Sequence, residues 1–541
     1  MADGGGRPQR GFNFPLKALT SALREGEIVV DLFAGGGGAS EGLEEALGRP
    51  VDIAVNHDPV AVGMHAANHP FTRHLREDVW AVDPISEVAG RQIGWFHASP
   101  DCRDFSQAKG GQPRSKVIRS LSWVVCKWAG RLNRLGLAPR IISLENVLQV
   151  TRWTKLVAKR DKATGRVIKL DEFGDVVGVA EPGERVPLDR QFLVPDKRSL
   201  GRTWKRFVAI LEGLGYVVEW RVLNAADYGA GTERKRLFLV ARRDGEPIQW
   251  PVPTHGQGRA NPAVSAADCI DWTIPTRSIF NRDKDLVPKS MQRLAKGIRK
   301  FVLETDDPYL IRTPDLLQIH QAQALSGCVA KIRGNSIGTA LQSGLPVITS
   351  GGGAKRPAGA AHALGLVTAF LEQANGGFYD GAGKDVRRPM STITKTAAQQ
   401  RLVTAHMAAC GADGERQTAA VGESARLRER AALQVAKFLV EHGGMVPRDD
   451  SVQALLKLVT VVVDGIAYMI VDVGMRMLKP HELFKAQGFG PHYIIDRTAD
   501  GTPLSNSAAN KMVGNSVSPH PMAALVRSVL GIQAAPLAQA A

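Results

Sequence analysis

Apolar and polar positions in the first half of the chain follow two alternating periodicities, which predict strands and helices in turn. The run EIVVDLF (27–33) is rich in β-branched residues and is closed by AGGGGAS, after which Leu43, Ala46 and Leu47 recur at helical spacing. Further strands are predicted at 51–55, 93–98, 139–147, 217–223 and 236–242, and amphipathic helices at 117–135 and 205–216. Strands separated by helices indicate an α/β fold with a mostly parallel sheet covered on both faces.

The alternation of strand and helix patterns ends near residue 250, and the segment 256–472 has a different composition. It is richer in Gly, Ser, Thr and Pro and holds short irregular apolar runs, so we predict a second, smaller domain of irregular β structure. Within it, 345–370 and 388–407 are weakly similar to each other, which fits either a duplication or two ordinary hairpins. Residues 1–26 and 533–541 are rich in Gly, Ala and Pro and are expected to be flexible.

Charge and cysteine content narrow the class of protein. The chain has 69 Lys+Arg against 53 Asp+Glu, and its net charge of +16 favours a polyanion such as nucleic acid as partner. The segment 275–300 is locally basic, which fits either a solvated face or phosphate contacts. The five cysteines lack disulfide or zinc spacing, so no metal site is predicted. No apolar run suits a membrane span and the first residues lack a signal-peptide centre, so a cytoplasmic protein is expected.

The glycine-rich turn is the first candidate for ligand binding. Such a turn between strand and helix lets the backbone approach a ligand closely. As a dinucleotide motif it is weak, because Ser40 stands where GxGxxG requires a third glycine. Asn56 and Asp58 follow the second predicted strand, and Asp78 lies where the next strand is expected to end. These positions fit a nucleoside-bearing cofactor or, equally, ordinary turn residues.

Two further positions have the chemistry of a catalytic pair. Cys102 and Glu145 lie at the carboxyl ends of predicted strands, the edge where open α/β sheets place their ligands. A thiolate beside a protonated carboxylic acid suits attack on an electron-poor ring whose neighbouring nitrogen must be protonated. Cys102 alone favours a packing role. Arg234 and Arg236 are two residues apart at the start of a predicted strand, so they are expected to share one face as paired cationic donors, or simply to form a strand edge.

Taken together and in order, these segments resemble the cytosine-5 DNA methyltransferases. DLFAGGGG is similar to that family's first cofactor motif, and SPDCRDFS to its nucleophile loop. LENV resembles its Glu-Asn-Val motif and YGAGTERKRLFLV its Gln-x-Arg-x-Arg motif, while MLKPHELFKAQGFG and NKMVGNSVSPH resemble its two closing motifs. The resemblance covers about 27–255 and 473–526.

The resemblance implies a Rossmann-like catalytic domain that binds S-adenosylmethionine, made of 27–255 and 473–541, with a target-recognition domain at 256–472. It implies that Cys102 is the nucleophile, that Glu145 is the acid at the ring nitrogen, and that Arg234 and Arg236 bind the flipped base and its surroundings. The implied cofactor contacts are Phe33, Gly35, Gly37, Asn56, Asp58, Asp78 and Asn515. Double-stranded DNA is the implied partner, with a cognate restriction endonuclease as a possible companion.

The sequence departs from the family's pattern at four places. Asp101 separates Pro100 from Cys102, where the family has Pro directly before Cys. Asn56 stands in place of a ribose-binding Glu, which an amide serves more weakly and which Asp58 can assist. Gly231-Thr232 replaces Pro-Gln. The segment between Val147 and the helix at 205 is longer than a minimal enzyme requires, and its DEFGDVVGV predicts a small hairpin. None of these removes a group that the chemistry needs.

Three rival functions stay open at this point. An RNA cytosine-5 methyltransferase has the same scaffold, but a much smaller recognition segment than 256–472 is expected there. A catalytically silent DNA-binding protein is suggested by Asp101, although the retained Cys102 and Glu145 disfavour it. A nicotinamide-dependent dehydrogenase is suggested by the glycine turn, but the missing third glycine and the non-acidic residue at position 56 disfavour it.

Overall fold

The computed structural model describes residues 22–105, 112–280, 282–311, 366–373, 380–394, 400–410 and 419–532. The chain divides into two compact units, one of Met1–Leu223, Arg236–Val252 and Pro519–Ala541, and one of Asn224–Lys235 and Pro253–Ser518. The motif-based assignment of 256–472 to target recognition stays a prediction, because compactness does not say what a segment binds. The expected tail at 533–541 and most of that at 1–26 lie outside the described residues.

The first unit is built on a seven-stranded sheet in the order β10-β12-β5-β4-β1-β2-β3. The five strands from β5 to β3 run parallel, and β12 is antiparallel to β5. This confirms the predicted mostly parallel α/β fold. The strands are β1 (Ile28–Leu32), β2 (Ile53–Val55), β3 (Arg73–Leu75), β4 (Ile93–Ala98), β5 (Ile141–Asn146), β10 (Val217–Asn224) and β12 (Lys235–Arg242).

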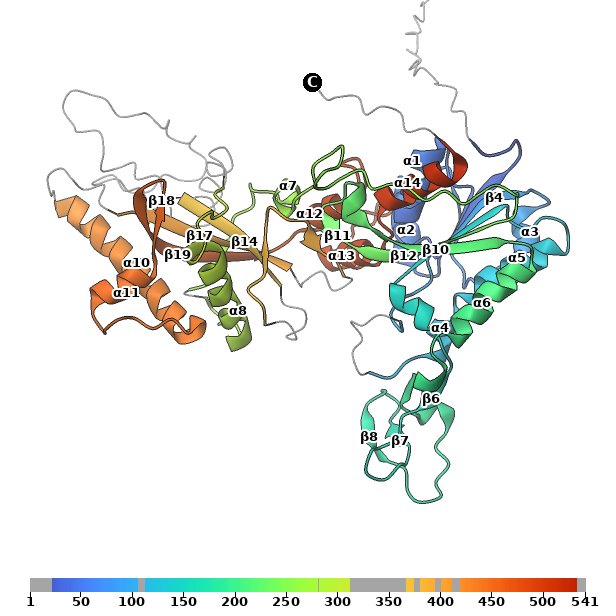
Figure 1. Cartoon of the computed structure of the whole chain (residues 1–541), viewed down its shortest axis with the longest axis horizontal. Helices are drawn as coiled ribbons and strands as arrows, with labels where there is room; N and C mark the ends of the chain where they lie inside the picture. The colour runs from blue at the N-terminus through green and yellow to red at the C-terminus, as the bar shows by residue number, and fades with distance from the viewer. Residues whose placement is uncertain are drawn as a thin grey trace, which may run out of the picture. The chain divides into compact units, whose positions relative to one another are not determined.

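Alternate residues of the central strands point to different helix layers. Val30 and Leu32 of β1 belong to the core cluster that also holds the apolar faces of α3, α5 and α6. The residue between them, Asp31, instead bonds to Ser40 of α1, which packs against α14 (Figure 1). The helices of this unit are α1 (Gly38–Leu47), α2 (Pro59–Asn68), α3 (Pro84–Val88), α4 (Lys116–Ser120), α5 (Trp123–Asn133), α6 (Arg202–Gly213) and α14 (Pro519–Leu530).

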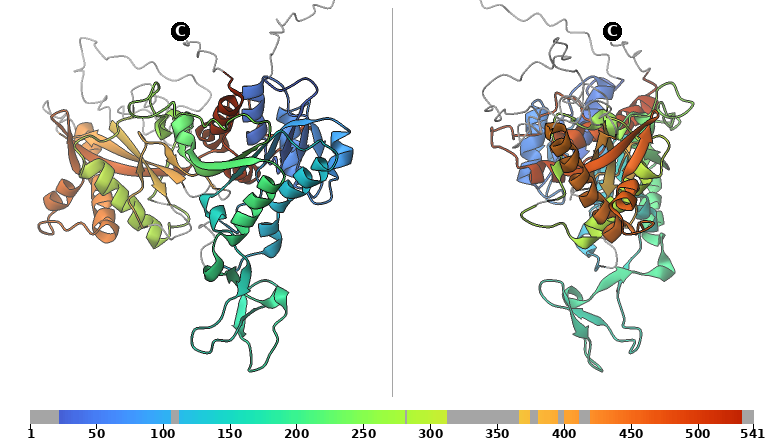
Figure 2. Two further views of the ribbon diagram at one scale, coloured as in Figure 1. Left: turned by 45° about the vertical axis from the view of Figure 1, so that its right-hand side comes forward. Right: turned by 90° about the vertical axis from the view of Figure 1, so that its left-hand side faces the viewer.

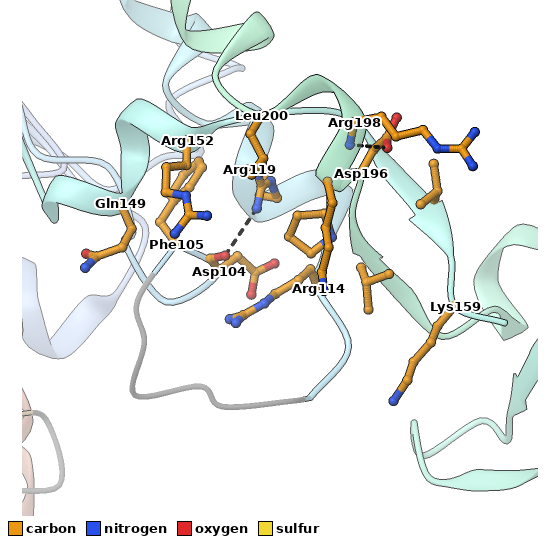
Figure 3. A pocket seen from close by; sticks show the side chains of 14 residues that line it. Asp104, Phe105, Arg114, Arg119, Gln149, Arg152, Lys159, Asp196, Arg198 and Leu200 are labelled. Atoms are coloured by element: carbon orange, nitrogen blue, oxygen red, sulfur yellow. Dashed lines mark hydrogen bonds between the residues drawn. The ribbon is translucent and has the colours of Figure 1, made fainter. Parts of the chain in front are cut away.

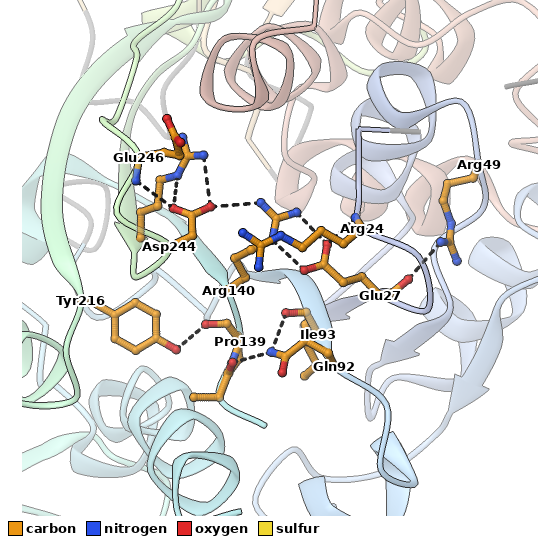
Figure 4. Close-up of polar contacts among 12 residues, drawn as sticks. Arg24, Glu27, Arg49, Gln92, Ile93, Pro139, Arg140, Tyr216, Asp244 and Glu246 are labelled. Atoms are coloured by element: carbon orange, nitrogen blue, oxygen red, sulfur yellow. Dashed lines mark hydrogen bonds and ion pairs between the residues drawn. The ribbon is translucent and has the colours of Figure 1, made fainter. Parts of the chain in front are cut away.

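The amino edge of the sheet is held by buried ion pairs (Figure 4). Arg140, just before β5, donates Nε and Nη2 to the carboxylate of Glu27, just before β1, both at 2.6 Å. Its Nη1 lies 3.1 Å from Asp244, which follows β12 and pairs with Arg242 at 2.6 Å. Burial lowers the pKa of Arg140, but its bonds to the two carboxylates outweigh burial and raise that pKa overall. Because removing one partner of a buried pair costs about 3–5 kcal/mol, this edge of the sheet is structural.

The long segment after β5 forms two small antiparallel strand pairs, one nested inside the other along the chain, and we call it the two-hairpin segment. β6 (Leu156–Ala158) pairs with β9 (Leu193–Pro195), and β7 (Ile168–Leu170) pairs with β8 (Val176–Val179). The turn between β7 and β8 is closed by a hydrogen bond from the Asp171 amide to the Asp175 carbonyl, at 2.9 Å. This confirms the hairpin that DEFGDVVGV predicts. In Figures 1 and 2 the four strands lie together at the end of an extension that leaves the sheet after β5.

The second unit contains β structure, as predicted, in a sheet that is smaller than the first and largely antiparallel, with the order β13-β19-β17-β14-β15 and β18 beside β19. The weakly similar segments pair with each other here, since β14 and β17 are antiparallel neighbours, although 345–365 lies outside the described residues. The strands are β11 (Thr232–Glu233), β13 (Arg277–Ser278), β14 (Leu366–Gln373), β15 (Lys384–Asp385), β16 (Met390–Ser391), β17 (Gln400–Ala409), β18 (Thr460–Val463) and β19 (Ile466–Met477).

Helices accompany this sheet to a degree that the sequence did not lead us to expect. The long helix α10 packs against β19, α8 and α11 (Figure 1). Its buried residues Ala432, Val435, Ala436 and Leu439 follow helical spacing. The helices of this unit are α7 (Ala266–Cys269), α8 (Pro288–Ile298), α10 (Ala419–Gly443), α11 (Val452–Leu458), α12 (Pro480–Gln487) and α13 (Asn506–Asn515).

Candidate active site

The candidate residues of the first unit gather at the carboxyl edge of its sheet. Ala98 at the end of β4 lies opposite both Leu32 at the end of β1 and Leu144 of β5. Leu32 in turn lies opposite Val55 of β2, which lies opposite Leu75 of β3. Because these strands are parallel and in register, the loops that follow them leave the sheet at one edge, where α/β proteins bind ligands. Antiparallel β12 begins at this edge.

The glycine turn after β1 has a backbone that only small residues adopt readily. Gly35 and Gly37 have φ of 56° and 96°, and Phe33 has φ of 62°. Left-handed backbone favours glycine, so the sequence AGGGG fits this turn. The amide of Ala34 donates to the carbonyl of Val55 at 3.2 Å, which joins the turn to β2. Gly37 precedes α1, so the turn and the helix N-terminus together offer backbone N–H groups to a ligand.

The loop that carries Cys102 is tied to strands on both of its sides. The Ser99 hydroxyl donates to the carbonyl of Phe33 at 3.3 Å, and the Asn146 amide donates to the carbonyl of Pro100 at 3.0 Å. Cys102 is partly buried, packs against the core cluster, and accepts a hydrogen bond at its carbonyl from the Phe105 amide at 3.0 Å. The bond from Asn146 holds this loop beside the end of β5, where Glu145 lies.

The two aspartates that flank the nucleophile position have partners of their own. The carboxylate of Asp101 accepts from Arg103 Nε at 2.5 Å and from the Arg103 amide at 2.8 Å. The buried carboxylate of Asp104 accepts from the Ser115 amide. The inserted Asp101 is thus neutralised within its own turn, and the backbone amide of Ser115 satisfies Asp104.

The structure brings Glu145 and Arg236 together. Arg236 Nε lies 3.1 Å from Glu145 Oε1, and the exposed fractions of the two side chains are 14% and 8%. They come from neighbouring antiparallel strands, in which Glu145 lies opposite Phe238. A carboxyl group with restricted access to water and a cation at its oxygen is held in one orientation at the sheet edge.

Arg234 has different partners from Arg236. β12 begins at Lys235, so Arg234 precedes the strand and the alternation that predicted a shared face does not extend to it. Its side chain is buried, and Nη1 donates to the carbonyls of Ile393 at 3.1 Å and Gly514 at 3.2 Å. Arg234 thus joins two distant segments of the second unit.

The residues expected at the cofactor lie in short capping structures. Asn56 Oδ1 accepts from the Asp58 amide at 2.9 Å, and Asp58 caps α2 by accepting from the amides of Val60 and Ala61. The exposed Asp78 accepts from the Trp80 amide at 2.9 Å. Asn515, in the second unit, is exposed at the end of α13.

These residues suit a nucleoside-bearing cofactor. Gly35 and Asn56 lie close to each other beside the glycine turn, together with His65 and His74. A side-chain amide and an exposed carboxylate, that of Asp78, supply the hydrogen-bonding groups that ribose hydroxyls and an adenine amino group require.

Sequence reasoning missed a buried polar chain beneath this turn. Ser40 Oγ donates to Asp31 Oδ2 at 2.8 Å and lies 2.9 Å from His65 Nε2, while His65 Nδ1 lies 2.8 Å from His74 Nε2. Burial raises the pKa of Asp31 to about 7. Burial, followed by the charges of His69 and His74, lowers the pKa of His65. The one indication of this chain in the sequence was Ser40, a polar residue at the position where the dinucleotide motif has glycine.

Neither a membrane-spanning helix nor a metal-binding cluster occurs among the described residues. None of the helices in the described ranges has both the length and the apolarity to cross a bilayer. Nor do the described side chains include a group of three or more His, Cys, Asp or Glu arranged to hold a metal ion.

Comparison with known proteins identifies a sequence family that these motifs resemble. The sequence model of C-5 cytosine-specific DNA methylases matches residues 28–171 and 191–285 of this chain. That match includes the glycine turn, Cys102, Glu145 and both arginines.

Curated relatives match over a similar region. Type II methyltransferase M.SacI of Streptomyces achromogenes is 25% identical over 42% of this chain and 50% of its own length. M.AquIA of Picosynechococcus sp. is 26% identical over 42% of this chain and 77% of its own length. M.XorII of Xanthomonas oryzae pv. oryzae is 28% identical over 45% of this chain and 46% of its own length. The alignment thus spans about half the length of the first and third of these relatives. Among solved structures, the Entamoeba histolytica methyltransferase EhMeth aligns over 94% of this chain and 99% of its own, with 13% identity and a TM-score of 0.41.

Proposed function

Because residues 28–171 and 191–285 match the sequence model of C-5 cytosine-specific DNA methylases, we propose that the protein methylates cytosine at carbon 5 in double-stranded DNA. The observation that carries this proposal is the shared sheet edge. The Cys102 loop follows β4, and Glu145 lies near the end of β5, the adjacent parallel strand. Asn146 of β5 donates to the Pro100 carbonyl of the loop at 3.0 Å and so joins the two. The glycine turn leaves the neighbouring strand at the same edge.

In the proposed reaction a cytosine first leaves the duplex, which costs a few kcal/mol. The Cys102 thiolate adds to ring carbon 6 while Glu145 donates a hydrogen bond or a proton to ring nitrogen 3, which makes carbon 5 nucleophilic. S-adenosylmethionine, when bound, supplies an electrophilic methyl group. Loss of the proton from carbon 5 then restores the ring double bond as the bond to Cys102 breaks.

The arginines have separate parts in this proposal. Arg236 would position Glu145 through the 3.1 Å contact and would donate to the flipped base when it enters the site. Arg234 acts on the surroundings of the base, because it fixes the backbone at Ile393 and Gly514.

We assign cofactor binding to the glycine turn and to the loops beside it. The turn would bring its backbone against the cofactor, while Asn56, with Asp58 beside it, would bind the ribose and Asp78 the adenine amino group. Asn515 would complete the site from the second closing motif. The full set is Phe33, Gly35, Gly37, Asn56, Asp58, Asp78 and Asn515.

The proposed target-recognition part is 256–472, with the basic helix α8 as a candidate phosphate contact. Because the substrate is genomic DNA, we expect the protein to act in the cytoplasm of a bacterial or phage-infected cell. A cognate restriction endonuclease is a natural companion, since methylation of its site would protect host DNA.

The test is bisulfite sequencing of DNA from cells that express the wild-type chain or Cys102→Ser. The wild type should leave 5-methylcytosine at one recurring sequence, which also identifies the target site. The Cys102→Ser protein should leave none and still bind duplex DNA, because the substitution removes only the nucleophile. Methylation by the variant, or methyl transfer to tRNA and not to duplex DNA by the wild type, would overturn the proposal.

A further inference from the structure

A large cavity in the first unit lies beside the Cys102 loop and has no part in the reaction described above. Its volume is about 830 Å³. Asp104 and Phe105 form one side, and the two-hairpin segment that follows β5 forms another (Figure 3). The apolar lining comes from Phe105, Val157, Val194, Pro195 and Leu200.

The charged lining of this cavity is strongly basic. Six cationic side chains face two carboxylates. Asp104 already accepts from a backbone amide. Asp196 accepts from the Arg198 amide at 3.0 Å and lies 3.6 Å from Lys155, a cation outside the lining. Because six cations outnumber two carboxylates, the lining keeps an excess of positive charge. The cationic residues are Arg114, Arg119, Arg152, Lys159, Lys197 and Arg198.

One of these cations, Arg119, is buried and has a guanidinium N–H group without an acceptor among the described residues. Arg119 is 5% exposed and donates to the carbonyls of Asp104 at 3.3 Å and Thr154 at 3.2 Å. Its guanidinium lies 4.5 Å from the centre of the Phe105 ring, and its Nε is buried without a hydrogen-bond partner among the described residues. Burial lowers the pKa of Arg119 to about 10, because the charge of Asp104 opposes this effect only in part and Arg114 adds to it. An anion in the cavity would offset the burial of this positive charge and would give its Nε a hydrogen-bond acceptor.

The remaining cations stand on separate segments around this point. Figure 3 shows Arg114 and Arg152 on the side of Phe105, with Lys159 on the wall formed by the hairpins. The Lys159 ammonium lies 4.4 Å from the centre of the Phe192 ring, which restrains this side chain. Cations spread over several segments fit a chain of phosphates better than one isolated phosphate.

We propose that this cavity binds backbone phosphates of the DNA strand next to the flipped cytosine, so that the two-hairpin segment is a second DNA-holding element. The inference rests on the proposed function. Asp104 and Phe105 follow Cys102 by two and three residues, so a nucleotide that reaches Cys102 brings its neighbouring phosphates to this wall. Phosphates follow one another at about 3.4 Å of axis per strand, so several can meet the cations of the cavity.

The test compares the double variant Arg152→Gln/Lys159→Gln with the matched control Lys162→Gln/Arg185→Gln. The control lies in the same segment, removes the same charge and does not line the cavity. The dissociation constant for a fluorescent duplex is measured over a series of salt concentrations, without cofactor. For the cavity variant the slope of log affinity against log salt should fall by about 0.9 per lost phosphate contact, about 1.8 in total, with affinity reduced on the order of tenfold. The control should match the wild type.

Three results would overturn this inference. The first is a cavity variant that has the melting temperature of the wild type and also the wild-type slope of log affinity against log salt. The second is an equal loss in the control, which would show a general effect of charge. The third is a loss of affinity for tRNA with none for duplex DNA. Because these are binding measurements, they are separate from methyl transfer. A wild type that binds DNA through the cavity and transfers no methyl group would refute the proposed function and leave only the phosphate contacts of the cavity.

Discussion

Glu145 and Arg236 show how much of the proposed chemistry depends on single side chains. The carboxyl group is 8% exposed and is fixed by one cation at 3.1 Å. A group held in this way loses little entropy when the base arrives, and so can serve as a well-oriented acid. The assignment predicts a loss of rate, and no loss of DNA binding, when the acid is replaced by its amide.

Replacing Glu145 with Gln should therefore lower the single-turnover rate of methyl transfer by about 10²- to 10⁴-fold, the usual contribution of a general acid. The amide keeps the size of the side chain, so the dissociation constant for duplex DNA should stay within about twofold of the wild type. Arg236→Lys, which preserves the positive charge, should lose less rate than Arg236→Gln. A wild-type rate in Glu145→Gln would remove Glu145 from the mechanism.

Asp31 gives the buried polar chain a measurable pH dependence. Its folded-state pKa is raised to about 7 from 3.8, chiefly by burial. Between these values the folded protein holds a proton that the unfolded chain has released, so this group's contribution to stability falls as pH rises. Asp31→Asn removes that contribution. The melting temperature of the variant relative to the wild type should therefore increase from about pH 5 to about pH 7, and a constant difference would contradict the assigned pKa.

At the scale of elements, α14 brings the end of the chain back to the first sheet. It packs on α1 so closely that a Cβ atom at Gly42 would lie 2.5 Å from the Pro519 carbonyl oxygen and 2.8 Å from the Met522 Cβ. Both obstacles are parts of α14 that cannot swing aside. Glycine at position 42 is thus required for the packing of the two helices.

Gly42→Ala should destabilise the protein by about 1–3 kcal/mol, the cost of overpacking a tight core. The matched control is Gly130→Ala, in the interior of α5, where a Cβ atom would meet nothing within 4 Å. There alanine should stabilise by up to about 1 kcal/mol through helix propensity. Chemical denaturation followed by circular dichroism measures both, and equal effects would show that helix propensity alone decides at position 42.

The bounds of some helices and strands were predicted better from the sequence than those of others. The buried strand at 93–98 was predicted with its observed bounds because an uninterrupted apolar run leaves little choice of face. The helix predicted at 117–135 is instead divided into α4 and α5, where Arg119 turns inward to Asp104 and Thr154. Periodicity does not report such a tertiary contact. The strand predicted at 236–242 is observed at Lys235–Arg242, but Arg234 lies before it and bonds to the carbonyls of Ile393 and Gly514, which its spacing from Arg236 could not indicate.

At the scale of the whole molecule, ordered motifs predicted more than composition did. The glycine turn, Cys102, Glu145 and Arg236 lie at one sheet edge, as the strand order requires. The basic cavity and the buried chain from Asp31 to His74 were not foreseen, because each joins residues that are distant in sequence and carry no motif. Net charge indicated a polyanion but could not say where on the surface it binds.

The central claim is that the Cys102 sulfur bonds to carbon 6 of a cytosine lifted from the duplex. The most direct measurement uses duplex DNA with 5-fluorocytosine at the target position. Fluorine takes the place of the carbon-5 hydrogen and cannot be removed by a base, so after methyl transfer the elimination is blocked and the bond to Cys102 cannot break. With S-adenosylmethionine present, the wild type should form a DNA adduct that survives denaturing electrophoresis, and Cys102→Ser should form none. Absence of the adduct in an active wild type, or its presence in Cys102→Ser, would contradict the account.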